Sequence, residues 1–168
     1  MVGDSRLNSE DGVLREQLQA LWREELCPAA NGLILASGEY LALVTEIRNV
    51  HLWKYSFRWS RPTWQDIRPI LADERFTDLD ALCSVAVDDG RVVAGETSYG
   101  SEGFVAYQSS DRELRWVLIF SNSNPFVRVT CDGETISAMS SYEFVLQVPL
   151  HHPETAFAAD EGVCDVIP

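Results

Sequence analysis

The chain is most constrained by a series of short apolar segments, separated by tight-turn signals, in its second half. Residues 83–96 alternate apolar and polar side chains on both sides of Asp89-Gly90. The dipeptide Asp132-Gly133 interrupts a second alternating stretch in the same way. Asp-Gly between alternating runs is the strongest short hairpin signal, and consecutive hairpins place successive strands side by side. The sequence therefore predicts a largely antiparallel meander sheet.

The segment LRWVLIF, residues 114–120, is expected at the centre of this sheet. It is apolar at positions on both faces, and such a strand is covered on both faces. Because neighbouring side chains of a strand point in opposite directions, Val117 and Ile119 should share one face. The other face should then carry Leu114, Trp116, Leu118 and Phe120.

An N-terminal helix is predicted over residues 9–26, where apolar residues recur at three- and four-residue steps. Ser9 is the expected N-cap. Cys27-Pro28 should end the helix, because a residue that precedes proline leaves helical geometry. Three strands should follow, at 33–36, 40–47 and 51–59.

A second, short helix is expected within residues 63–75, capped by Thr63 or Asp66. Pro69 would have to lie in its first turn, where a missing N–H is tolerated. The predicted fold class is therefore α+β, a largely antiparallel meander sheet with both helices packed on it. A length of 168 residues suits a single domain, with residues 1–8 and 154–168 loose at its ends.

The charge balance limits the partners that the chain can have. Acidic side chains number 26 against 13 basic ones, which gives a net charge of −13. A surface this acidic repels phosphate backbones and anionic membranes, so neither nucleic acid nor membrane is an expected partner. A basic protein would be attracted, although solubility alone is a sufficient reason for the excess of acid.

Cysteine usage and the N-terminus predict a reduced, cytoplasmic protein. The four cysteines are far apart and form no C-x-x-C pair, so neither a zinc site nor any other metal site is expected. The first residues show no signal-peptide pattern, and no apolar run approaches the roughly 20 residues of a membrane span.

Two polar loops are the candidate sites for a small ligand. The glycine-rich stretch GETSYGSEGF, residues 95–104, is interpreted as a connector between strands, because a phosphate loop should open a helix and carry a lysine. The stretch SNSNPF, residues 121–126, is interpreted as a turn. A ligand loop stays open as the alternative for both.

Catalytic signals are weak, so enzymatic activity is left uncertain, leaning to its absence, and no cofactor is assigned. His151 and His152 are adjacent and read as surface residues. Glu96 and Glu102 could form a carboxylate pair, but nothing in the sequence sets their separation. Exposed aromatic residues could instead form a recognition surface, although strand alternation favours the core for about half of them. They are Trp53, Tyr55, Trp59, Trp64, Tyr99 and Trp116.

Three segments resemble a type of small acidic bacterial protein: RVVAGETSYGSEGFVAY, LRWVLIFSNSNPFVRV and ISAMSSYEFVLQVPLHHP. The chain also resembles the immunity proteins of bacterial polymorphic toxin systems. That resemblance implies a cytoplasmic α+β protein that binds and neutralises a cognate toxin. It implies no catalytic residue.

The expected function is therefore a non-enzymatic protein-binding role, most concretely an immunity-type inhibitor that occludes a basic toxin. Acidic side chains would steer the toxin and two aromatic side chains would anchor it. The expected acidic set is Glu96, Glu102, Asp111 and Glu113, and the anchors are Tyr99 and Phe126. The alternatives are a small-molecule or enzymatic domain that uses the 95–104 and 121–126 loops, or a structural component of a larger assembly.

Overall fold

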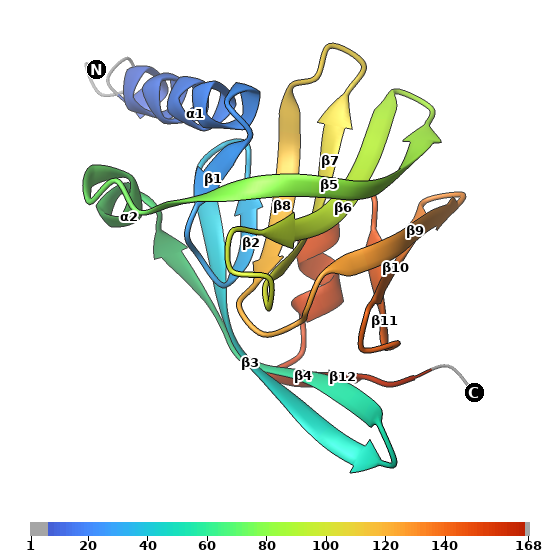
Figure 1. The fold of residues 1–168 in the computed structure, drawn as a ribbon. Coiled ribbons are helices and arrows are strands. Elements are labelled where there is room, and N and C mark those ends of the chain that lie inside the picture. Colours follow the sequence, from blue (N-terminus) through green and yellow to red (C-terminus); the bar gives the residue numbers. More distant parts are fainter. Residues whose placement is uncertain (1–6, 167–168) are drawn as a thin grey trace.

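A computed structural model describes residues 7–166 and confirms an α+β fold built mostly from antiparallel strands (Figure 1). The helices are α1 (Leu7–Arg23), α2 (Arg68–Ala72) and the 3₁₀ helix η1 (Pro153–Phe157). The strands are β1 (Leu26–Pro28), β2 (Gly32–Leu35), β3 (Glu39–His51), β4 (Lys54–Asp66), β5 (Phe76–Val87), β6 (Gly90–Thr97), β7 (Gly103–Ser109), β8 (Leu114–Phe120), β9 (Phe126–Asp132), β10 (Thr135–Ser140), β11 (Val145–Pro149) and β12 (Glu161–Cys164).

The strands of the described chain form two sheets. The larger has nine strands in the order β1-β5-β6-β7-β8-β2-β3-β4-β12, and the smaller has the order β11-β10-β9. The runs β5 to β8 and β9 to β11 are the predicted meanders, and β8 lies at the centre of the nine strands as expected. The hairpin β5–β6 turns through Asp88-Asp89, and β9–β10 turns at Gly133-Glu134.

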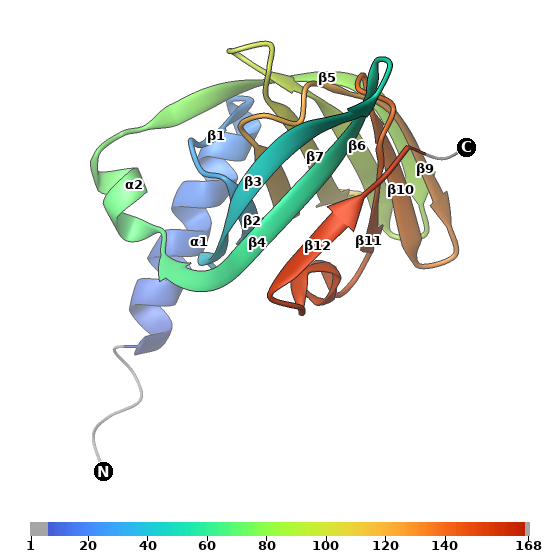
Figure 2. The same ribbon diagram turned by 90° about the horizontal axis from the view of Figure 1, so that it is seen from below.

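Each face of the large sheet is covered by a different partner (Figure 2). Helix α1 packs on one face, where its Leu18 meets Ile34, Val117 and Ile119. The small sheet packs on the other face, around Phe120. The strand β8 is apolar on both faces because both faces are inside the protein.

The side of Leu114 is a correction to the sequence prediction. Leu114 belongs to the α1 side with Val117, not to the side of Trp116. The pairing of β7 with β8 shifts between Tyr107 and Gln108, so that Arg115 is skipped. Such a bulge adds one residue and reverses the alternation beyond it.

The predicted helix boundaries are only partly correct. Helix α1 already contains Ser9, which is therefore not its N-cap, and residues 1–6 of the expected loose end lie outside the described chain. The helix ends at Arg23, before the predicted Leu26, and Glu25 has a positive φ of 57°. A left-handed residue just after a helix is a common terminator.

The second helix is shorter than predicted, at five residues. Residues 63–66 belong to β4 instead, where Trp64 pairs with Leu41 of β3, so sheet pairing overrides the helical pattern. Pro69 does lie in the first turn of α2. The N-cap of α2 is Ile67 rather than Thr63 or Asp66, although the carboxylate of Asp66 accepts a hydrogen bond from the Arg68 backbone N–H at 3.0 Å.

The C-terminal segment is not loose as far as the structure describes it. Phe157 of η1 is 1% exposed, and its ring packs edge-on against Trp59 at 5.3 Å between centroids. Strand β12 pairs with β4 (Figure 2), and Gly162 faces the Trp59 ring so closely that a Cβ would collide with it. The acidic composition of this segment suggested a loose tail, whereas one buried ring and strand pairing hold the segment in place.

Candidate functional site

The four acidic residues expected to steer a partner do not form one surface. Glu96 and Glu102 flank the β6–β7 connection, whereas Asp111 and Glu113 lie in the β7–β8 connection at the opposite end of β7. Glu102 accepts a hydrogen bond from the Thr97 hydroxyl at 2.5 Å. The carboxylate of Glu113 lies 3.5 Å from the Arg15 guanidinium. Two of the four are thus already engaged within the protein.

The two expected aromatic anchors differ in exposure. Tyr99 is 73% exposed in the β6–β7 connection. Phe126 is fully buried between Phe120 and Phe144, so its proposed role as a surface anchor is wrong. Phe126 is the first residue of β9 and points into the space between the two sheets. Burial of its apolar ring there stabilises the fold more than exposure at the surface would.

The glycine-rich stretch 95–104 is a strand connector, as predicted. Gly95 belongs to β6 and Gly103 to β7, which leaves residues 98–102 as the loop. A Cβ at Gly95 would collide with the Asp80 carbonyl oxygen, and one at Gly103 with that of Asn124. These two glycines permit close backbone approach rather than a positive φ.

The polar loop 121–126 lies beside that connector, because the Asn124 backbone N–H donates to the Ser101 carbonyl at 2.9 Å. Its polar side chains bond within the protein. Asn122 donates to the Thr45 carbonyl at 2.9 Å, and the Ser123 hydroxyl donates to the Asn124 carbonyl at 2.9 Å. This arrangement fits the turn interpretation.

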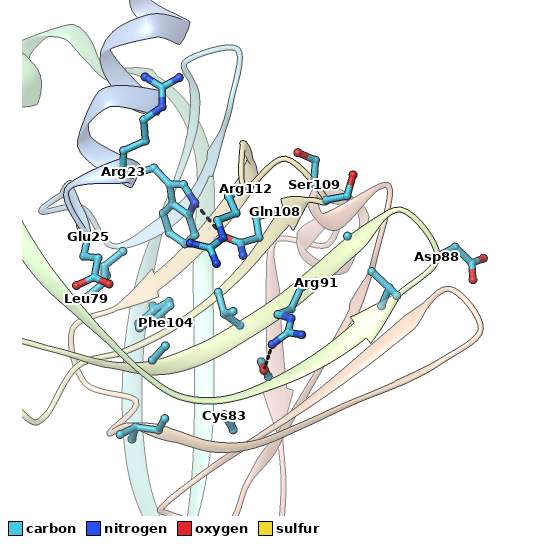
Figure 3. Close-up of a pocket in the computed structure, with 18 residues that line it drawn as sticks. Arg23, Glu25, Leu79, Cys83, Asp88, Arg91, Phe104, Gln108, Ser109 and Arg112 are labelled. Atoms are coloured by element: carbon cyan, nitrogen blue, oxygen red, sulfur yellow. Dashed lines mark hydrogen bonds between the residues drawn. The ribbon is translucent and has the colours of Figure 1, made fainter.

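A groove of about 910 Å³ opens on the α1 side of the large sheet (Figure 3). We call it the arginine groove. Its floor is formed by β5, β6 and β7, and its wall by the C-terminal end of α1 and the turn that follows. The residues that matter for the argument are Trp22, Arg23, Glu25, Leu82, Asp88, Arg91, Gln108 and Arg112.

Three arginines from three separate elements line this groove. Arg23 ends α1, Arg91 lies on β6, and Arg112 lies in the β7–β8 turn. Arg91 donates a hydrogen bond to the Ser84 hydroxyl at 3.2 Å. Among the described residues, none of the three arginines forms an ion pair within 4.0 Å. They are therefore free to bind anionic groups of a ligand.

The groove also holds an ordered amide and an exposed leucine. The Trp22 indole N–H donates to the Gln108 side-chain oxygen at 3.1 Å, which leaves the Gln108 amide NH₂ available as a donor. Leu82 is 47% exposed at the point where the β5–β6 register shifts. The arrangement offers cationic donors beside an apolar contact.

Cys83 lies on β5 at the groove, but its side chain packs on the opposite face of the sheet, against the core around Phe126, and its thiol is not activated there. Burial raises its pKa, and the sulfur lies 3.7 Å from the carbonyl oxygens of Ala94 and Phe126. All four cysteines are free thiols, and burial raises the pKa of Cys164 to about 11. No group of three or more metal-ligating side chains occurs among residues that the structure describes.

A second cleft, of about 610 Å³, lies near the β5–β6 turn. The Tyr107 hydroxyl donates a short hydrogen bond to the Asp89 carboxylate. Burial, and then this bond, raise the pKa of Tyr107 to about 12, and the bond lowers the pKa of Asp89. His151 and His152 are both exposed, as expected, and His151 stands edge-on to the Tyr107 ring at 6.0 Å.

The long hairpin β3–β4 ends in an exposed tip, residues 48–54, which we call the arm tip. It extends beyond the rest of the ribbon in Figure 1. Trp53 is 83% exposed and Leu52 is 75% exposed. These two residues form the turn between His51 and Lys54, with positive φ values of 28° for Leu52 and 70° for Trp53.

The arm is also the basic part of an acidic chain. Residues 47–65 contain four basic side chains and no acidic one, and they are Arg48, Lys54, Arg58 and Arg61. Of the aromatic residues considered as a recognition surface, Trp53, Trp64 and Tyr99 are exposed, whereas Trp59 and Trp116 are buried. Aromatic exposure and basic charge therefore coincide at the arm.

Sequence reasoning missed the arginine groove and the turn of the arm tip, although Trp53 was among the aromatic residues considered for a recognition surface. The three groove arginines lie far apart along the chain, and only the fold brings them together. Leu52-Trp53 carries no glycine, asparagine or proline to mark a turn.

Comparisons of the chain with protein-family models, with curated proteins and with solved structures found no significant match. Within residues 7–166, no helix combines the length and the apolar character needed to cross a membrane.

Proposed function

We propose that this chain is a non-enzymatic partner-binding protein, an inhibitor of the immunity type, and that the β3–β4 arm makes the decisive contact. The resemblance to immunity proteins supports the class of function. The arm tip supports the choice of contact surface, in place of the scattered acidic loops.

The observation that carries this proposal is the pair of residues in the β3–β4 turn. A two-residue hairpin turn with positive φ at both positions strongly favours Asn-Gly or similar residues. Leu52 and Trp53 occupy these positions instead and expose their side chains to solvent. Large apolar residues in left-handed conformations are strained. A departure from local preference without a gain in packing is expected where function requires it.

The chemistry of the arm tip defines the complementary surface. A tryptophan with an adjacent leucine fits an apolar pocket, and tryptophan is among the residues most enriched in binding hot spots. Arg48 and Lys54 flank the turn, so the rim of that pocket should be acidic. The net charge of −13 still favours a partner that is basic as a whole, because net charge acts at longer range than the contact.

Occlusion is the mechanism that this geometry favours. An arm that extends from a rigid sheet can enter a cleft of the partner without rearrangement of the fold. The partner's cleft would then be blocked by Trp53 itself, and no chemical step by this chain is required.

Photo-crosslinking from the arm tests the proposal. Benzoylphenylalanine replaces His51, which is exposed and adjacent to the turn, while Leu52 and Trp53 stay in place. The matched control carries the same group at Tyr99, which is 73% exposed on another loop. Irradiation in a lysate of the native host should crosslink one protein from position 51 and not from position 99.

The same experiment is repeated in the variant Leu52→Asn/Trp53→Gly. Loss of the crosslink is the expected result, because the apolar contact is gone and the turn is retained. A crosslink from position 99 alone, or one that persists in the double variant, would overturn the assignment of the arm. A crosslink between two copies of this chain would favour the structural-component alternative.

A further inference from the structure

We propose that the arginine groove is a second protein-binding site, independent of the arm, and that it takes an extended acidic peptide segment of a partner protein. The proposal rests on the groove's length, on the two arginines that lie over its floor without an ion pair, Arg91 and Arg112, and on the exposed Leu82. It does not depend on the function proposed for the arm.

The shape of the groove favours an extended chain. Its floor follows β5 from Leu79, which bonds to the Glu25 carbonyl at 2.9 Å, to Asp88 at the far end (Figure 3). At roughly 3.3 Å per strand residue this path is on the order of 25–30 Å long. About eight residues of an extended peptide cover that distance.

The charges of the groove favour carboxylates in the middle of that peptide. Arg91 and Arg112 lie over the floor, whereas the Arg23 guanidinium points away from it along α1 (Figure 3), and neither Arg91 nor Arg112 is neutralised by an ion pair within the described chain. Charge-assisted hydrogen bonds from guanidinium groups to carboxylates are about twice as strong as neutral ones. The guanidinium groups of Arg91 and Arg112 attract anionic side chains locally, although the net charge of the whole chain is −13.

The ends of the groove argue against a dense polyanion. Glu25 lines one end and Asp88 the other. A nucleic acid or a polyphosphate would bring negative charge to both ends, whereas a peptide can carry apolar or neutral residues there. The groove therefore favours a peptide whose carboxylates are spaced along the chain and whose two end residues are neutral.

Leu82 supplies the apolar part of the recognition. Its side chain is 47% exposed, because the register shift between Ala81 and Cys83 turns it out of the regular alternation. In an extended peptide, side chains alternate between two faces. Such a peptide could place carboxylates against the arginines and an apolar residue against Leu82.

A labelled peptide provides the test. The probe is a fluorescein-labelled octapeptide of alternating valine and glutamate, and its counterpart has lysine in place of glutamate. Fluorescence anisotropy should rise in a saturable way with the glutamate peptide and not with the lysine peptide. Higher salt should weaken the binding, because the contacts are ionic.

Two double variants with the same change of charge locate the site. Arg91→Glu/Arg112→Glu reverses two groove charges, and Arg58→Glu/Arg128→Glu reverses two exposed arginines that do not line the groove. We expect the first to weaken binding by about tenfold or more and the second to change it by less than about twofold. Thermal unfolding of each variant confirms that it is folded.

The outcomes are distinct. No saturable binding of the glutamate peptide, or an equal loss in both double variants, would overturn the proposal. Binding that is fully displaced by stoichiometric citrate would also overturn it, because the occupant would then be a small anion rather than a peptide. In Leu52→Asn/Trp53→Gly the peptide should bind as in the wild type, and a loss there would contradict the independence of the two sites.

Discussion

The arginine groove and the arm tip are both exposed binding features, yet they are built in opposite ways. The groove lies on three neighbouring strands and one helix, and Phe104 beneath it is 1% exposed. The arm tip is held by a single pair of strands, and its side chains are exposed from Arg48 to Lys54. A site on the sheet inherits the rigidity of the core, whereas the arm tip depends on local turn geometry alone.

The largest expected difference lies in the response to truncation. Phe104→Ala should lower the free energy of unfolding by about 3–5 kcal/mol, because it leaves a cavity between the sheet and α1. Trp53→Ala should change it by less than about 0.5 kcal/mol, because an 83% exposed ring contributes little packing. Urea unfolding of both variants measures the contrast. Comparable losses would show that the arm tip is packed in solution.

A second expected difference is that stability near one end of the groove should depend on pH through the hydrogen-bonded pair Tyr107 and Asp89. The raised pKa of Tyr107 means that its stabilising contribution is present below the ordinary tyrosine pKa of 10.0 and is lost as the pH rises through about 12. The lowered pKa of Asp89 means that its contribution is present at neutral pH and is lost as the pH falls through that lowered value. The pair lies at the β5–β6 turn, beside Asp88 at one end of the groove.

Ultraviolet titration of the folded protein should therefore show one tyrosine that ionises near pH 12. In Asp89→Asn that midpoint should fall, because the carboxylate and its hydrogen bond help to raise it, but should stay above the ordinary value because Tyr107 is still buried. An unchanged midpoint in Asp89→Asn would contradict the coupling.

A smaller difference in the free energy of unfolding is expected when one polar contact is removed from the groove and one from the arm. Gln108→Leu leaves the half-buried Trp22 indole N–H without its partner and should lower the free energy of unfolding by about 1 kcal/mol. Glu46→Gln breaks a 3.0 Å ion pair with Arg48 in the arm, where both side chains are 54% exposed. Exposed ion pairs contribute little and often nothing measurable to stability. Thermal unfolding of both variants should separate the two contacts, and equal losses would place the arm pair in a drier environment.

The fold could be predicted from the sequence where the signal is local. The hairpins at Asp89-Gly90 and Asp132-Gly133 and the central strand 114–120 follow from alternation and turn residues, and the structure confirms them. Such local signals could not predict which segments far apart in the sequence pair with one another. Residues 63–66 have a helical pattern but pair with β3, and the acidic tail is ordered by Phe157 and by strand pairing.

The candidate sites were harder to predict, for two physical reasons. Arg23 and Arg91 lie 68 positions apart in the sequence, so only the packing of α1 beside β6 and β7 brings them into one groove. Phe126 was misassigned because a phenylalanine after a proline turn can face either side of a sheet, and the strand register decides which. The turn at Leu52-Trp53 violates the residue preferences by which turns are recognised.

That violation gives the prediction with the clearest contrast in function. Leu52→Asn/Trp53→Gly should raise the free energy of unfolding by up to about 1 kcal/mol, because asparagine and glycine adopt positive φ with less strain. Partner binding through the arm should be lost in the same variant, while peptide binding in the arginine groove should not change. A destabilised double variant would mean that Leu52 and Trp53 are there for local packing, and the case for a strained turn kept for binding would fail. A stabilised variant that still binds its partner would leave the strain without a functional reason, so stability and binding must be measured on the same protein.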